Sequence, residues 1–211
     1  MVTETVVHVI DDDDAMRESL AFLLDTAGLP ARTYDSAAEF LEQAQSLTEG
    51  CIVTDVRMPE MSGLELVQRL KERGVTLPVI VITGHGDVPL AVQAMKAGVI
   101  DFLEKPFSDD ALLGAIQSAL KAPAPTAGGG TETRDTEETR RFEALVAALS
   151  PREEEVFMGV VAGKANKVIA LELGISPRTV EVYRANVMTK TGAANLSELV
   201  RMALLAGVRV D

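Results

Sequence analysis

The chain has 211 residues, a length that fits two ordinary domains or one large domain. Its 47% hydrophobic and 25% charged content is typical of a globular protein, and it has neither a basic-then-apolar signal segment nor an apolar run of membrane-spanning length. The single cysteine excludes an internal disulfide and fits a reducing compartment. We therefore expect a cytoplasmic protein without a membrane partner.

The net charge of −12 is unevenly distributed. Residues 1–121 hold 20 acidic and 9 basic side chains, whereas residues 142–211 hold 8 of each. Within Lys164–Lys190 five basic residues outnumber two acidic ones. An acidic surface repels nucleic acid, so only the second half of the chain is a candidate for binding it.

The first half alternates short β-branched runs with amphipathic stretches. Such alternation predicts a parallel sheet covered by helices on both faces. The expected strands are Val6–Ile10, Ala31–Tyr34, Cys51–Thr54, Val79–Thr83 and Asp101–Leu103. The expected helices are Ala15–Ala27, Ala37–Gln45, Gly63–Arg73, Val88–Ala97 and Asp109–Leu120.

The segment KAPAPTAGGG at Lys121–Gly130 marks a change in composition. A stretch rich in Pro, Ala and Gly does not hold a regular element, so we expect a hinge here, followed by a lead-in helix. After it the pattern predicts only helices. We therefore expect a domain over 1–121, a linker over 122–141 and an all-α domain over 142–211.

Polar groups follow several predicted strands of the first domain. They are Asp11, Asp12, Asp55, Thr83 and Lys105. Right-handed crossovers bring the carboxyl ends of parallel strands to one edge of a sheet, so these groups can converge. Carboxylates without a Cys/His cluster suit a hard cation such as Mg²⁺ rather than zinc.

This set fits phosphoryl transfer to a carboxylate. Asp55 would be the nucleophile, because an aspartate can form an acyl phosphate. Mg²⁺ held by Asp11 and Asp12 would offset charge, Lys105 would bind a phosphate oxygen, and Thr83 would donate a hydroxyl hydrogen bond.

Each of these residues also has a structural interpretation. Residues 12–14 could cap the next helix. Asp55 could begin a turn, Lys105 could be solvated, and Thr83 could simply belong to its strand. Their joint occurrence in this order favours the functional interpretation.

The sets DDDD, TDVRMPEMSG, VIVITGHGD and DFLEKPF resemble the receiver domain of two-component response regulators, over residues 4–121. The resemblance implies a five-stranded sheet in the order 2-1-3-4-5 and phosphorylation of Asp55 by a sensor histidine kinase. It also implies Mg²⁺ binding by Asp12, Asp55 and the backbone carbonyl of Arg57, with Asp11 acting through water. The Lys105–Pro106 bond of this motif is typically cis.

Receivers also switch through a hydroxyl and an aromatic residue, here Thr83 and Phe102. The resemblance implies that the hydroxyl moves toward the phosphoryl group while the ring turns inward. Two receivers would then pair through the fourth helix and fifth strand. The residues placed on that face by analogy are Val92, Lys96 and Phe102.

The second half contains a helix, turn and helix pattern. Asn166–Leu173 is followed by Gly174, and Ser176 and Pro177 are good N-cap and N1 residues for a second helix. That helix would bury Val180, Tyr183 and Val187 and expose Arg178, Val182, Ala185 and Thr189. Such a face suits base reading, but a surface helix of a plain bundle would show the same pattern.

The string from LSPREEEVF to NLSELV, residues 149–206, resembles the four-helix LuxR-type helix-turn-helix domain. This resemblance places Lys167, Arg178 and Lys190 at phosphate-contacting positions. Base-facing positions are Thr179, Glu181, Val182 and Ala185. Glu181 could accept from a cytosine amino group or point along the groove.

A receiver joined to a LuxR-type domain is similar to the NarL/FixJ class of response regulators, and GHGDVPLAVQAMKAGVIDFLEKPF is closest to the FixJ type. The resemblance implies a phosphorylation-activated transcription factor for nitrogen-fixation or microaerobic genes. Its implied partners are a FixL-like kinase, double-stranded DNA, RNA polymerase and a second copy of the phosphorylated chain.

Two alternatives remain. A Mg²⁺-dependent aspartyl phosphatase is disfavoured because Arg57 stands where such enzymes carry a second Asp. A phosphorylation-independent scaffold is disfavoured by the complete acidic set. We expect no turnover of external substrates, and at most autodephosphorylation.

Overall fold

A computed structural model describes residues 5–84, 88–121 and 132–208. They form two compact units: a sheet unit of 5–84 and 97–121, and a helical unit of 132–208 with which the segment 88–96 is grouped. That segment is helix α4 (Val88–Lys96), which we expected within the first domain. The domain boundaries stay predictions. No described helix is long and apolar enough to span a membrane.

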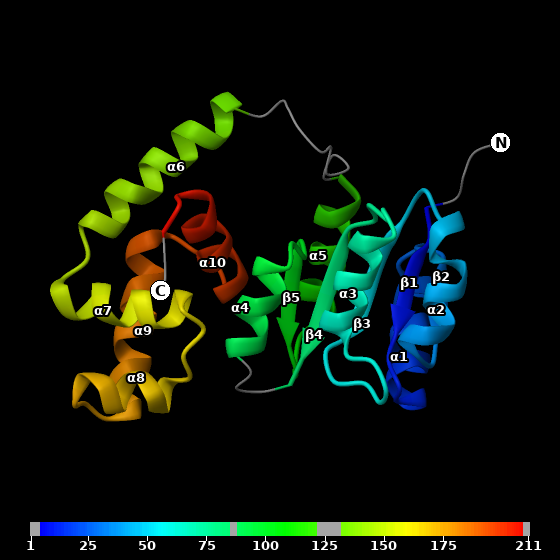
Figure 1. The fold of residues 1–211 in the computed structure, drawn as a ribbon, viewed down its shortest axis with the longest axis horizontal. Coiled ribbons are helices and arrows are strands. Elements are labelled where there is room, and N and C mark those ends of the chain that lie inside the picture. Colours follow the sequence, from blue (N-terminus) through cyan, green and yellow to red (C-terminus); the bar gives the residue numbers. More distant parts are fainter. Residues whose placement is uncertain (1–4, 85–87, 122–131, 209–211) are drawn as a thin grey trace. The chain divides into compact units, whose positions relative to one another are not determined.

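The sheet unit contains five parallel strands in the order β2-β1-β3-β4-β5, as predicted (Figure 1). The strands are β1 (Val7–Ile10), β2 (Ala31–Tyr34), β3 (Cys51–Asp55), β4 (Val79–Thr83) and β5 (Asp101–Glu104). Every residue of β1, β3 and β4 is buried. Continuous burial of β-branched runs is what a parallel sheet covered on both faces requires.

Helices cover both faces of this sheet. Helices α1 (Asp14–Thr26) and α5 (Asp109–Lys121) share one apolar cluster with β1, β3 and β4. Helices α2 (Ala37–Gln43) and α3 (Gly63–Glu72) contact each other, and α2 also contacts β2. The helix expected over Ala37–Gln45 ends earlier, because a 3₁₀ turn at Ala44–Ser46 follows it.

The helical unit contains the lead-in helix and the four helices expected after it. They are α6 (Glu132–Ala147), α7 (Pro151–Val161), α8 (Asn166–Leu173), α9 (Pro177–Thr191) and α10 (Leu196–Leu205). Its core is built around Phe157, which is fully buried and lies 6.1 Å from the Phe142 ring of α6, centroid to centroid. Helix α6 therefore packs into this core and continues past residue 141, where we expected the linker to end.

The turn between α8 and α9 forms as its sequence indicates. Gly174 has a φ of 65°, a left-handed conformation that an L side chain disfavours. The hydroxyl of Ser176 accepts a hydrogen bond from the Thr179 amide at 3.1 Å, and Pro177 occupies the first turn of α9. The predicted caps thus fix where the second helix begins.

Candidate functional site

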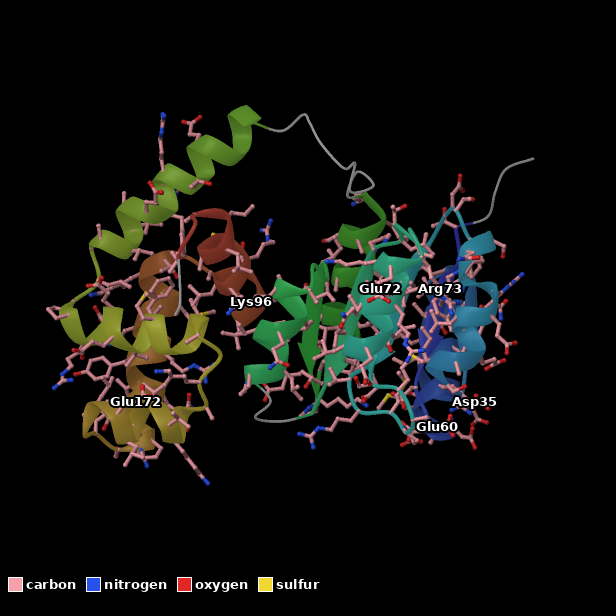
Figure 2. All side chains as sticks on the ribbon, viewed as in Figure 1. Asp35, Glu60, Glu72, Arg73, Lys96 and Glu172 are labelled. Carbon is pink, nitrogen blue, oxygen red and sulfur yellow. The ribbon has the colours of Figure 1, made fainter. Side chains whose placement is uncertain are left out.

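Predicted site residues meet at the edge of the sheet unit where the parallel strands end. Asp55 and Thr83 are the last residues of β3 and β4, whereas Asp11 and Lys105 directly follow β1 and β5. Figure 2 shows Asp35, which directly follows β2, at this same edge. The alternation of strands and helices accounts for this convergence.

Lys105 bridges the two buried carboxylates of the site. Its Nζ lies 2.6 Å from Oδ1 of Asp55 and 3.4 Å from Oδ2 of Asp11. Asp11 and Asp55 are 2% and 8% exposed, so their charges need compensation. The Lys105–Pro106 bond is cis, as expected. Lys105 is therefore paired within the site, and the alternative of a freely solvated lysine is wrong.

Burial and charge act in opposite directions on the ionisable groups. Burial raises the pKa of Asp11, although the Asp13 amide and Lys105 oppose this rise, and the nearby Asp55 charge adds to it. Burial also lowers the pKa of Lys105, but the hydrogen bonds and charges of Asp55 and Asp11 together raise it above its ordinary value. Lys105 is therefore held in its charged form beside the carboxylates.

The second oxygen of Asp55 is oriented by the backbone. Its Oδ2 accepts a hydrogen bond from the Arg57 amide at 2.6 Å. This bond and the ion pair to Lys105 restrain both carboxylate oxygens. Asp55 thus has the fixed orientation that a nucleophile needs.

The residues fit a hard divalent cation in charge and donor type. Asp11 and Asp55 carry two negative charges against the single charge of Lys105, and their donors are all oxygens. Asp12 is exposed beside them. Within the described ranges no group of three or more His, Cys, Asp or Glu side chains is placed to hold a metal ion, so Asp11, Asp12 and Asp55 do not form such a group by themselves. An ion here would complete its shell with water and backbone carbonyls, as Mg²⁺ commonly does.

Thr83 carries an unsatisfied hydroxyl. It is 2% exposed, and its Oγ1 has no hydrogen-bond partner within the part of the chain that the structure describes. An unpaired buried hydroxyl costs about 1–3 kcal/mol, so this atom points to a missing acceptor. Phe102, the second predicted switch residue, is also buried.

The other aspartates of the acidic run have a structural role. Asp13 is the N-cap of α1, and its side chain accepts hydrogen bonds from the amides of Ala15 and Met16. Asp14 pairs with Arg17 in the first turns of the helix. The capping alternative is therefore correct for Asp13.

Two residues of the site were missed from the sequence. Arg17 donates from Nη1 to the carbonyl oxygen of Asp11 at 2.6 Å and so fixes the loop after β1. A Cβ on Gly63 would lie 2.2 Å from the carbonyl oxygen of Asp55, so the start of α3 approaches the site too closely for any side chain. The signal for Gly63 was its place directly after the cap Ser62.

Helix α9 presents the second candidate site. Val180 and Val187 are buried and Tyr183 is partly buried, as predicted. The exposed face carries Arg178, Glu181, Val182, Ala185 and Thr189, with Thr179 partly exposed beside them, and Lys167 is exposed on α8. Val182 is 56% exposed, so it is accessible to a base, although single exposed apolar side chains are common on protein surfaces and Leu171 of α8 is 84% exposed.

Two basic residues of α9 are engaged inside the unit. Arg184 donates from Nη1 to Oδ1 of Asn166 on α8 at 2.8 Å. Lys190 lies 2.6 Å from Oε2 of Glu153 on α7. Of the three residues placed at phosphate positions, Lys190 is thus the one with an ion-pair partner among the described residues.

The residues placed on the pairing face differ in exposure. Lys96 is exposed, whereas Val92 and Phe102 are buried. Cys51 is buried and forms no disulfide, and its burial raises the thiol pKa to about 12. His85 lies outside the described residues.

Comparison with known families and proteins identifies both units. Residues 7–117 match the response regulator receiver domain, and residues 147–203 match the bacterial regulatory proteins of the luxR family. The transcriptional regulatory protein FixJ of Azorhizobium caulinodans is 60% identical over 96% of this chain and 93% of its own. FixJ of Bradyrhizobium diazoefficiens is 52% identical over the full length of both chains.

A solved structure supports the same family. The crystal structure of full-length FixJ from B. japonicum has a TM-score of 0.56 and 51% identity, covering 99% of this chain and 100% of that one. The chain therefore belongs to the NarL/FixJ class of two-component response regulators, which join a receiver domain to a LuxR-type DNA-binding domain.

Proposed function

We propose that Asp55 accepts a phosphoryl group from a FixL-like sensor histidine kinase and that this modification activates DNA binding by the helical unit. The observation that carries the proposal is the convergence of Asp55, paired with Lys105, and the unpartnered hydroxyl of Thr83 at one edge of the sheet. A transferred phosphoryl group supplies the acceptor that Thr83 lacks. Mg²⁺, held through Asp11, Asp12, Asp55 and the Arg57 carbonyl, would neutralise charge on the transferring group when bound.

The chain's own residues then have defined roles. A carboxylate oxygen of Asp55 attacks phosphorus, the phosphorus–nitrogen bond of the phosphohistidine breaks, and the imidazole leaves with the electron pair. Lys105 binds a phosphoryl oxygen, and Thr83 donates its hydroxyl proton to another in a charge-assisted hydrogen bond. The movement of Thr83 leaves space that the Phe102 ring fills.

DNA binding follows from the pairing of two receivers. The altered face carrying Val92, Lys96 and Phe102 joins two receivers, and the paired helical units bind a two-fold DNA operator. A dimer suits this task because the phosphate contacts of two modules combine. Lys167 and Arg178 contact phosphates, Lys190 stands at a third phosphate position by the resemblance alone, and the base-facing residues are Thr179, Glu181, Val182 and Ala185. With RNA polymerase recruited there, the regulator activates nitrogen-fixation or microaerobic genes.

This function involves no turnover of an external substrate. The relatives are transcriptional regulators. Arg57 occupies the position at which an aspartyl phosphatase would need a general acid. After phosphorylation, the one further reaction that we propose for the chain is hydrolysis of its own phosphoaspartate.

The test is the variant Asp55→Asn. With acetyl phosphate and Mg²⁺, the intact mass of the wild-type chain should gain one phosphoryl group, and that of the variant should not. Asp35→Asn is the matched control, because Asp35 is an exposed carboxylate at the end of another strand of the same sheet. Undiminished labelling of the Asp55 variant would refute the assignment.

The pairing step is tested separately by sedimentation. The phosphorylated wild-type chain should show a larger dimer fraction than the unmodified chain. Equal dimer fractions in both states would contradict pairing while leaving phosphorylation intact.

A further inference from the structure

Helix α7 begins with a buried carboxylate. Ser150 and Glu153 form a capping box in which Oε2 of Glu153 accepts a hydrogen bond from the Ser150 amide at 2.7 Å. Capping glutamates are commonly solvent-exposed, but Glu153 is only 4% exposed. A buried carboxylate needs a cation beside it.

That cation comes from a distant helix. Nζ of Lys190, in the last turn of α9, donates to the same Oε2 at 2.6 Å, although the two residues are 37 positions apart. The hydrogen bond from Lys190, followed by those from Ser150, lowers the pKa of Glu153 to about 2. One carboxylate oxygen thus joins the start of α7 to the end of α9.

This pair differs from the other ion pairs of the helical unit. Arg152–Glu155 and Lys164–Glu172 each have both side chains between 39% and 51% exposed, whereas the Glu153 side chain is 6% exposed. Exposed pairs contribute little to stability. Here only the carboxylate is buried, since the Lys190 side chain is 43% exposed, but loss of Lys190 leaves that buried carboxylate without its cation. The Glu153–Lys190 pair therefore constrains its helices more than the others do.

Helix α9 has a second polar attachment at its middle, where Arg184 binds Asn166 of α8. The Glu153–Lys190 pair attaches the C-terminal turn of α9 to α7. We propose that Lys190 is a positioning residue: held by Glu153, it sets the direction of α9 in the DNA groove and does not itself bind a phosphate. This inference rests on the proposed contact of α9 with DNA and revises the phosphate role that the resemblance gave Lys190.

A small tilt of α9 is enough to disturb base reading. Val182 lies eight residues before Lys190, which is about 12 Å along a helix axis. A tilt of about 10° over that length moves the side chain by about 2 Å, whereas binding groups must stay within about 0.5 Å of their productive position. Loss of the pair should therefore weaken sequence-specific binding more than nonspecific binding.

The two roles of Lys190 predict opposite results for Glu153→Gln. The amide of Gln can still accept from the Ser150 amide, but it no longer attracts Lys190. If Lys190 positions α9, affinity should fall about tenfold. If Lys190 binds phosphate, freeing it should leave affinity unchanged or increase it.

The experiment measures binding of the full chain, treated with acetyl phosphate and Mg²⁺, to a fluorescent duplex that the wild type has selected from a random library. Lys190→Met should weaken binding as much as Glu153→Gln, and the double variant should bind no worse than either single variant. For Lys190→Met, the slope of log affinity against log salt concentration should stay at the wild-type value. A slope reduced by about 0.9, the contribution of one phosphate contact, together with additive losses, would overturn the proposal.

Two controls complete the design. Glu155→Gln removes the exposed pair on the same helix and should leave affinity unchanged. Lys167→Met should reduce the salt slope and shows that the assay detects a phosphate contact. Circular dichroism checks the fold. If Glu153→Gln does not fold, the salt slope of Lys190→Met, whose side chain is 43% exposed, decides the question alone. A wild-type chain that selects no duplex would contradict the proposed function instead.

Discussion

We expect His8 to make the sheet unit less stable in acid. It lies in the middle of β1 with 1% exposure, its Nδ1 is 3.1 Å from the Tyr34 hydroxyl, and its Nε2 has no hydrogen-bond partner among the described residues. The Phe40 ring lies 5.5 Å away, centroid to centroid. Burial, and then the charge of Arg32 on the adjacent strand, lowers the pKa of His8 from 6.5 to about 4. The folded chain therefore disfavours a charged imidazole at this position.

The sign and size of the effect follow from proton linkage. Between pH 6.5 and pH 4 the unfolded chain binds a proton at His8 that the folded chain does not, so stability falls as the pH falls through this window. The stabilisation is complete above pH 6.5. With these two pKa values, the free energy of unfolding should decrease by about 2 kcal/mol between pH 7.5 and pH 5.

The assay compares urea unfolding of the wild type and His8→Gln at pH 7.5, 6 and 5. Gln keeps a hydrogen-bonding group for Tyr34 but does not titrate, so it removes only the acid sensitivity. The stability difference between the two proteins should change by about 2 kcal/mol in favour of the variant at low pH. Parallel pH profiles would refute the reasoning and would mean that His8 accepts a proton in the folded state.

Three further substitutions test other contacts. Lys105→Met should destabilise the metal-free sheet unit by about 1–3 kcal/mol, because it leaves two buried carboxylates without a cation. Added Mg²⁺ should restore part of the lost stability, measured by thermal unfolding. Gly63→Ala should lower the free energy of unfolding in a urea titration by about 1–3 kcal/mol and reduce phosphate uptake, because its Cβ would overlap the Asp55 carbonyl. The control Gly114→Ala, whose Cβ meets nothing within 4 Å, should leave the free energy of unfolding unchanged or raise it. Phe157→Ala should cost the helical unit about 3–5 kcal/mol in urea unfolding, because it empties a fully buried site; a smaller loss would mean that the core closes over the cavity.

The sequence was most informative where local chemistry decides the structure. The strand Val79–Thr83 and the helix Asn166–Leu173 have the predicted bounds, because a β-branched run and a Gly C-cap leave few alternatives. The helix ending at Thr26 instead of Ala27 shows the usual uncertainty at helix ends. The strand order came from the resemblance, since periodicity does not specify which strands pair.

The sequence was least informative about long-range polar contacts. Nothing local indicates that the Arg17 guanidinium binds the Asp11 carbonyl, or that Glu153 would be buried against Lys190. A capping box reads the same whether its glutamate is exposed or buried. Only the packing of α7 against α9 decides this, and packing depends on the whole fold.

Under the proposed function, the Thr83 hydroxyl also limits the energy of the switch. A charge-assisted hydrogen bond to a phosphoryl oxygen is worth about 1.5–3 kcal/mol, whereas moving a two-state equilibrium from 1:99 to 99:1 requires about 5.5 kcal/mol. Thr83 alone is therefore insufficient. The remaining energy must come from Lys105 and from the pairing of two receivers, because the Phe102 ring is already buried. Because pairing depends on concentration, the proportion of active receiver should rise with protein concentration at fixed phosphorylation. Asp55 thus begins a switch that a single chain cannot complete.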